Sequence, residues 1–113
     1  MKLELLSHSM QMNKKGVATM DDFKVGRYFV RRTISPMSDG EVWTRIQVQG
    51  DRDAEYLPPI QYDDDVWSDN PNPRFEIQTT AYGAKGVEDI EKVIAGYQEA
   101  LEVVNLLTEK FLK

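Results

Sequence analysis

The sequence predicts an α+β fold, in which a small antiparallel β-sheet of three to five strands is covered on one face by a long C-terminal α-helix. Apolar residues recur at helical spacing near the C-terminus, alternating segments that are typical of strands precede them, and a long acidic segment separates two of those strands. The chain has 113 residues, of which 41% are hydrophobic and 29% charged. This size and balance predict a single globular domain, residues 1–113.

Strands and turns are predicted in the first half of the chain from side-chain type and alternation. Residues 2–12 predict a first strand and residues 13–16 a turn, while residues 23–34 are rich in aromatic and β-branched side chains and predict one further strand. The proline, aspartate and glycine of residues 35–40 predict a turn into a partner strand at 41–49. That strand alternates, with Val42, Ile46 and Val48 predicted inward and Trp43, Arg45 and Gln47 outward.

Residues 51–73 form the most unusual segment, because they hold seven acidic side chains, one basic side chain and four of the five prolines. The acidity is local: the segment has a net charge of −6, against +3 for residues 1–50 and −2 for residues 74–113. Loops of this length are uncommon in compact domains and are usually functional or disordered. We therefore predict a long acidic loop before the last strand, with a partner-binding set of Tyr56, Tyr62, Asp63, Asp64, Asp65, Trp67 and Asp69.

The last strand and the helix follow this loop. Residues 74–82 alternate and predict a half-buried strand with Phe75 and Ile77 on the inner side. The helix is predicted from the apolar residues Val87, Ile90, Val93, Ile94, Tyr97, Ala100, Leu101, Val104, Leu107 and Phe111. Gly96 interrupts it and predicts a close packing contact. Val103 and Leu106 widen the apolar face, which indicates either a homodimer through the helix or a helix well wrapped by its own sheet.

The residue inventory argues against catalysis. The absence of cysteine excludes disulfides, thiolate nucleophiles and cysteine-based zinc sites. His8 is the one histidine and is expected on the surface, and no serine occupies a recognisable nucleophile motif. The glycines of residues 83–86 lack the spacing of a phosphate-binding loop, and the aspartates near residue 64 lack the EF-hand pattern. We predict a non-enzymatic protein with no cofactor and no metal, and a cytoplasmic location because no secretory signal or apolar span is recognised.

The acidic segment suggests recognition of a basic surface. Carboxylates along a proline-stiffened loop can imitate nucleic-acid phosphates, and aromatic side chains supply anchors at interfaces. In size and composition the chain resembles the small acidic inhibitors that phages and other mobile elements make against host nucleases, including anti-CRISPR proteins. This resemblance implies a partner that is a nucleic-acid-binding enzyme. The competing interpretation is intramolecular, with the acidic loop folded onto Arg27, Arg31, Arg32 and Arg45.

Two further functions remain open from the sequence. The outward residues Arg27, Arg31, Trp43 and Arg45 could form a basic and aromatic sheet face for single-stranded nucleic acid. The strand-to-helix order is similar to that of coactivator-type single-strand DNA binders, which are homodimers with a strongly basic sheet, whereas this chain has a pI of about 4.8. The third alternative is a structural interaction module without a ligand, in which the loop covers its own sheet.

Overall fold

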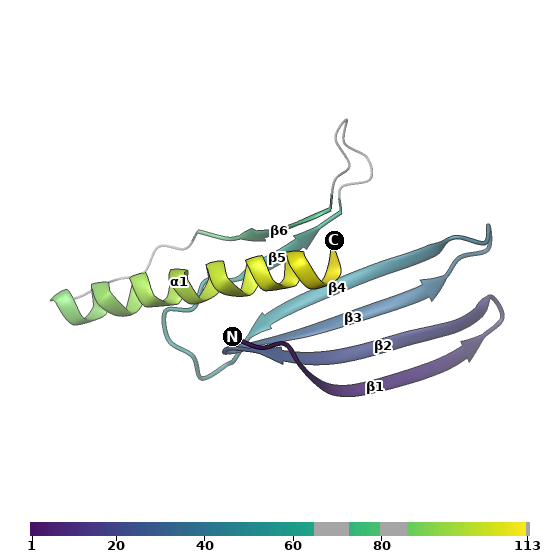
Figure 1. Cartoon of the computed structure of the whole chain (residues 1–113), viewed down its shortest axis with the longest axis horizontal. Coiled ribbons are helices and arrows are strands. Elements are labelled where there is room, and N and C mark those ends of the chain that lie inside the picture. The colour runs from purple at the N-terminus through teal and green to yellow at the C-terminus, as the bar shows by residue number, and fades with distance from the viewer. Residues whose placement is uncertain (65–72, 80–85, 113) are drawn as a thin grey trace.

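The computed structural model describes residues 1–64, 73–79 and 86–112, and it confirms the α+β fold (Figure 1). A four-stranded antiparallel sheet is followed by a second sheet of two strands and by one long helix. The elements are β1 (Glu4–Asn13), β2 (Gly16–Val25), β3 (Tyr28–Pro36), β4 (Val42–Gly50), β5 (Ile60–Asp63), β6 (Arg74–Ile77) and α1 (Gly86–Phe111). The four-stranded sheet has the order β1-β2-β3-β4, so each strand pairs with its neighbour in the chain.

The strand predicted over residues 23–34 is wrong, because a hairpin turn at Gly26 and Arg27 divides this segment between β2 and β3. Gly26 has φ of 56°, a left-handed conformation that glycine adopts without a steric cost. The missed strand β2 contains two adjacent aspartates, which have low β propensity. They are stabilised in the sheet by cross-strand pairing, since Asp21 lies opposite Arg32 and Asp22 opposite Arg31.

The predicted loop 51–73 is also corrected, because it contains the strand β5, which pairs antiparallel with β6. Residues 51–59 connect β4 to β5 and are fixed by buried contacts. The hydroxyl of the fully buried Tyr28 donates a hydrogen bond to the carbonyl of Pro58. Gly96 of α1 lies so close that a Cβ placed there would be 1.9 Å from the carbonyl oxygen of Tyr56. The packing contact predicted at this glycine is confirmed.

Helix α1 covers only part of the four-stranded sheet. Its C-terminal half packs on the sheet, where the rings of Phe23 and Phe111 lie 5.4 Å apart, and Glu99 bonds Arg27 at the turn between β2 and β3. Its N-terminal half projects past that turn, and the distal ends of the strands extend the other way without helix above them (Figure 1). The core therefore lies at the overlap of both sheets and the helix, with Val25, Tyr28, Val30, Ile46, Ile60, Phe75, Ala100, Val103 and Leu107.

The apolar face of α1 differs from the predicted one. Its buried residues are Gly96, Ala100, Val103 and Leu107, so Val103, which was predicted only to widen the apolar face, is part of the buried stripe. A second stripe of predicted core residues is exposed, namely Val87, Ile90, Ile94 and Leu101 at 70%, 50%, 52% and 54%. At about 100° per residue, this exposed stripe is about 60° wide and lies about 140° around the helix from the buried one.

Candidate binding surface at the β4–β5 cleft

A cleft of about 390 Å³ lies between the edge strands of the two sheets. We call it the β4–β5 cleft. Its walls come from Trp43, Thr44, Arg45, Ile46, Gln47 and Val48 on one side and from Ile60, Gln61, Tyr62 and Asp64 on the other. Four of these residues, Trp43, Arg45, Tyr62 and Asp64, come from two predicted binding sets that the sequence offered as alternatives. The fold therefore places part of each set at one surface.

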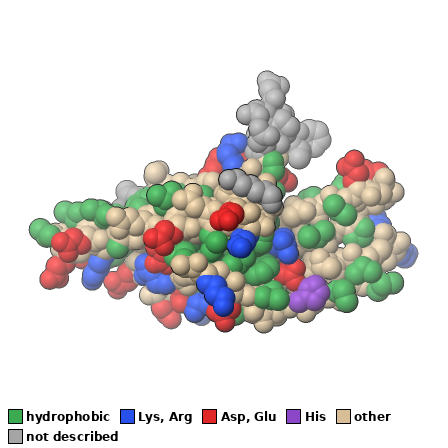
Figure 2. All heavy atoms as spheres, in the orientation of Figure 1, with side chains coloured by type: hydrophobic (Ala, Val, Ile, Leu, Met, Phe, Trp, Pro, Cys, Tyr) green, Lys and Arg blue, Asp and Glu red, His purple; other side chains and the backbone are tan. Residues whose placement is uncertain are grey.

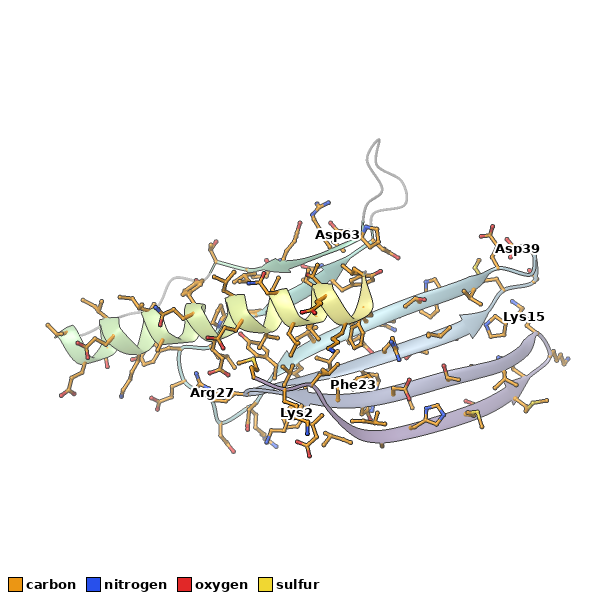
Figure 3. The ribbon with its side chains drawn as sticks, viewed as in Figure 1. Lys2, Lys15, Phe23, Arg27, Asp39 and Asp63 are labelled. Carbon is orange, nitrogen blue, oxygen red and sulfur yellow. The ribbon has the colours of Figure 1, made fainter. Side chains whose placement is uncertain are left out.

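The β5 wall of the cleft is aromatic and acidic. The ring of Tyr62 packs against that of Phe75 in β6, with centroids 5.2 Å apart, which fixes the side chain in place. Burial and the negative charge of Asp64 raise the pKa of the Tyr62 hydroxyl, so it stays protonated and can donate a hydrogen bond. Asp63 is held across the hairpin by Arg74, at 3.2 Å between Oδ2 and Nη2. This end of β5 is turned away from α1 (Figure 3).

The remaining members of the predicted partner-binding set are elsewhere or outside the described residues. Tyr56 has φ of 55° and is used internally, because its hydroxyl hydrogen-bonds Asp89 of α1. Burial, together with the charge and hydrogen bond of Asp89, raises the pKa of Tyr56. Asp65, Trp67 and Asp69 lie outside the described residues. The predicted set therefore divides into an internal anchor, Tyr56, and a group at the cleft, Tyr62 to Asp64.

Three of the four arginines that could have neutralised the acidic segment are paired with other carboxylates. Arg27 bonds Glu99 of the helix through Nε at 2.9 Å. Arg31 bonds Asp22, and Arg32 bonds Asp21, both across neighbouring strands. Within the part of the chain that the structure describes, Arg27, Arg31 and Arg32 therefore pair with carboxylates outside the acidic segment.

The predicted nucleic-acid face is only partly assembled. Trp43 and Arg45 lie on the sheet face turned away from α1, with Arg31 on the same face one strand over. Arg27 is not on this face, since it occupies the β2–β3 turn beneath the helix (Figure 3). Asp22 neutralises Arg31 through contacts of 2.8 and 3.2 Å, and this pairing lowers the pKa of Asp22 and raises that of Arg31. Of the predicted basic residues, Arg45 is left as the exposed cation at the cleft.

The opposite sheet face carries an ionic cluster that was not predicted from the sequence. The carboxylate of Asp21, which is only 8% exposed, is hydrogen-bonded to the ring nitrogen Nδ1 of His8. It also accepts a hydrogen bond from Nη2 of Arg32 at 3.3 Å. Burial alone would raise the pKa of Asp21, but the hydrogen bonds and charges of His8 and Arg32 outweigh it and lower the pKa. Arg32 also stacks on Phe111, 4.8 Å from its centroid. The sequence pattern that could have indicated this cluster is the adjacent acidic pair Asp21-Asp22 followed by the adjacent basic pair Arg31-Arg32.

In comparisons with known proteins, no family model, curated protein or solved structure matches the chain, so inferences about function depend on this geometry. Among residues 1–64, 73–79 and 86–112, no group of three or more histidines and carboxylates could hold a metal ion. No helix within those ranges is both long and apolar enough to span a membrane.

Proposed function

We propose that this is a non-enzymatic binding protein that engages a basic protein surface through the acidic end of the β5–β6 hairpin and the adjacent β4–β5 cleft. The observation that carries the proposal is the pairing of Arg27, Arg31 and Arg32 with carboxylates outside the acidic segment. Within the described part of the acidic segment, Asp63 pairs with Arg74, and those three arginines contact carboxylates of other segments. An acidic surface beside the exposed ring of Trp43 favours a cationic partner.

The cleft gives this surface its specificity in the proposal. Trp43 is 45% exposed on one wall, and on the other wall Tyr62 is held by Phe75, so Tyr62 has little conformational entropy to lose on binding. Asp64 at the rim would bind a lysine or arginine of the partner. A partner whose basic surface normally binds nucleic acid fits this chemistry, which is the proposed link to inhibitors of nucleic-acid-binding enzymes.

The test compares two variants that remove the same charge at different places. Asp64→Asn/Asp65→Asn removes two charges from the acidic segment, and Glu102→Gln/Glu109→Gln removes two from the exposed polar face of α1. The wild type and both variants are immobilised and exposed to lysate of the native host, and retained proteins are quantified. We expect the first pair to release the basic partner and the second to keep it, with unchanged melting temperatures. Equal retention by all three would contradict the proposal.

Single-stranded nucleic acid is the second candidate ligand, because Phe29 and Trp43 are 40% and 45% exposed on the face that carries Arg45. Stacking on such rings is largely independent of base sequence. A titration of the isolated protein with a fluorescent oligothymidine separates the two candidates. Salt-sensitive binding that Trp43→Ala and Arg45→Ala abolish would favour the nucleic-acid function, and the absence of binding would favour the protein partner.

A further inference from the structure

Two uncovered apolar surfaces lie at opposite ends of the molecule. The first is the helix stripe, defined as Val87, Ile90, Ile94 and Leu101. The second is the distal sheet face, defined as Met10, Met12, Val17 and Val42, which are 69%, 77%, 46% and 64% exposed. Figure 2 shows hydrophobic side chains along the projecting part of α1 and again at the far end of the sheet. Surfaces of this kind are unusual on a monomer unless they are used for association.

The distal sheet face is the continuation of the core face. Strand pairing places Met12 opposite Val17, and Val42 opposite Pro36, on the side of the sheet that carries Tyr28 and Val30. Val42 was predicted inward from the sequence, and all four positions lie on the core side of the sheet. They remain exposed because α1 ends above the part of the sheet where Phe111 contacts Phe23 and Arg32 (Figure 3).

The projecting helix and the uncovered sheet have matching lengths. From Gly86 to Glu99, where α1 meets the turn between β2 and β3, the helix extends about 20 Å at 1.5 Å per residue. From Asp21, which lies opposite the Arg32 that Phe111 contacts, to Gly16 at the distal turn, β2 extends about 17 Å at 3.4 Å per residue. The part of the helix that lacks a sheet is therefore about as long as the part of the sheet that lacks a helix.

The charges at the two ends are complementary as well. The first turn of α1 carries Glu88 and Asp89, at the positive end of the helix dipole. The turn between β1 and β2 carries the exposed Lys14 and Lys15 at the far end of the sheet (Figure 3). A helix laid along the distal sheet face with its N-terminus outward would bring these acidic and basic ends together.

We propose that a second copy of this chain covers both surfaces, so that the projecting half of each helix docks on the distal sheet face of its partner. The arrangement is self-complementary under a two-fold axis, and it buries both apolar surfaces of each chain in the same interface. Because the helix stripe points about 140° away from the helix's own core, the partner's sheet approaches from the opposite side. The two antiparallel helices then lie between the two sheets. This assembly is independent of the basic-partner function proposed for the β4–β5 cleft.

The first test uses paired substitutions at neighbouring positions. Ile94→Glu and Met12→Glu place a charge in the helix stripe and in the distal sheet face. The controls Ala95→Glu and Gln11→Glu add the same charge at exposed positions, the first about 110° around the helix from the stripe and the second on the opposite sheet face. Sedimentation is measured from micromolar to millimolar concentration. We expect a wild-type dimer at twice the 13.0 kDa mass of one chain. Each interface variant should raise its dissociation constant about a hundredfold and each control less than about threefold.

The second test uses the absence of native cysteine. The turn between β1 and β2, which carries Lys15, and the N-terminal end of α1, which carries Glu88, lie near opposite ends of the longest axis of one molecule (Figure 1). Because this axis measures 56 Å, cysteines at these two positions cannot form a disulfide within a chain. Mild oxidation of Lys15→Cys/Glu88→Cys should give a covalent dimer, and Asp39→Cys/Glu88→Cys, which uses the neighbouring turn, should give at least about fivefold less at the same concentration.

Three results would overturn the proposal. A wild-type protein that remains at 13.0 kDa over the whole concentration range has no such dimer. Dimers that Ile94→Glu disrupts and Met12→Glu does not would show that the helices pair with each other. Dimers that neither substitution weakens would show another interface, such as the exposed edge of β1. None of these results depends on the basic partner, so the two proposals fail separately.

Discussion

Gly96→Ala is expected to destabilise the protein, although alanine is intrinsically preferred to glycine inside a helix. In an exposed helix, alanine in place of glycine stabilises by about 1 kcal/mol. Here the new Cβ would stand 1.9 Å from the carbonyl oxygen of Tyr56 and 3.6 Å from a side-chain carbon of Pro58. Contacts below 3.0 Å are essentially never seen for real Cβ atoms, so the helix and residues 56–58 must separate by about 1 Å.

The connecting segment has little freedom to make that movement, because Pro58 is buried and its carbonyl accepts the hydroxyl of Tyr28. Overpacking of a well-packed site costs about 1–3 kcal/mol, and a backbone obstacle places this site at the upper end. After the helix preference is subtracted, Gly96→Ala should destabilise the protein by about 2 kcal/mol. This corresponds to a melting temperature lower by about 8 °C for a domain of this size.

The measurement is thermal unfolding followed by circular dichroism, with Ala95→Gly as the control. Residue 95 is exposed on the same turn of the helix, so Ala95→Gly measures the glycine cost without the contact, about 1 kcal/mol. If Gly96→Ala raises the melting temperature, or lowers it by less than Ala95→Gly does, the close approach of the connecting segment to α1 is refuted.

Two further predictions concern buried polar contacts. Tyr28→Phe removes the hydrogen bond to the Pro58 carbonyl and leaves that buried oxygen unpaired, so chemical denaturation should show a loss of about 1–3 kcal/mol with an unchanged m-value; a loss below 0.5 kcal/mol would contradict the contact. The lowered pKa of Asp21 means that its pairing with His8 and Arg32 stabilises the fold above the unfolded-state pKa near 3.8 and is lost as pH falls through the lower folded-state value. Asp21→Asn should therefore lower the melting temperature at pH 7 and flatten its decline below pH 4, and an unaltered acid decline would argue against the cluster.

Sequence patterns predicted those elements whose signal is local. The alternation of residues 41–49 predicted β4, and the spacing of residues 87–111 predicted α1, because period-two and period-3.6 patterns follow from backbone geometry alone. Strand β2 was missed because its centre, Asp21 and Asp22, is stabilised by partners on other strands, Arg31 and Arg32 of β3 and His8 of β1. Strand β5 was missed because four residues between prolines and aspartates carry too short a pattern.

The candidate site shows the same division. Sequence composition located the acidic segment and named Tyr62, Asp63 and Asp64, which lie at the end of β5. It could not show that Tyr56 serves as an internal anchor through Asp89, or that Trp43 and Arg45 share a cleft with Tyr62. These facts depend on how the second sheet lies against the first, which no local pattern encodes.

By itself, the sequence determined the fold class, the long helix, the acidic segment and the absence of cysteine chemistry, because composition and periodicity act locally along the chain. Only the tertiary structure decided which arginines neutralise which carboxylates, and which apolar residues of α1 are buried. A helix with an apolar sector broader than its own sheet can cover must leave part of that sector exposed, and which part depends on where the helix lies. That placement buries Val103 and leaves Ile94 in solvent, at the surface where we expect the second copy to bind.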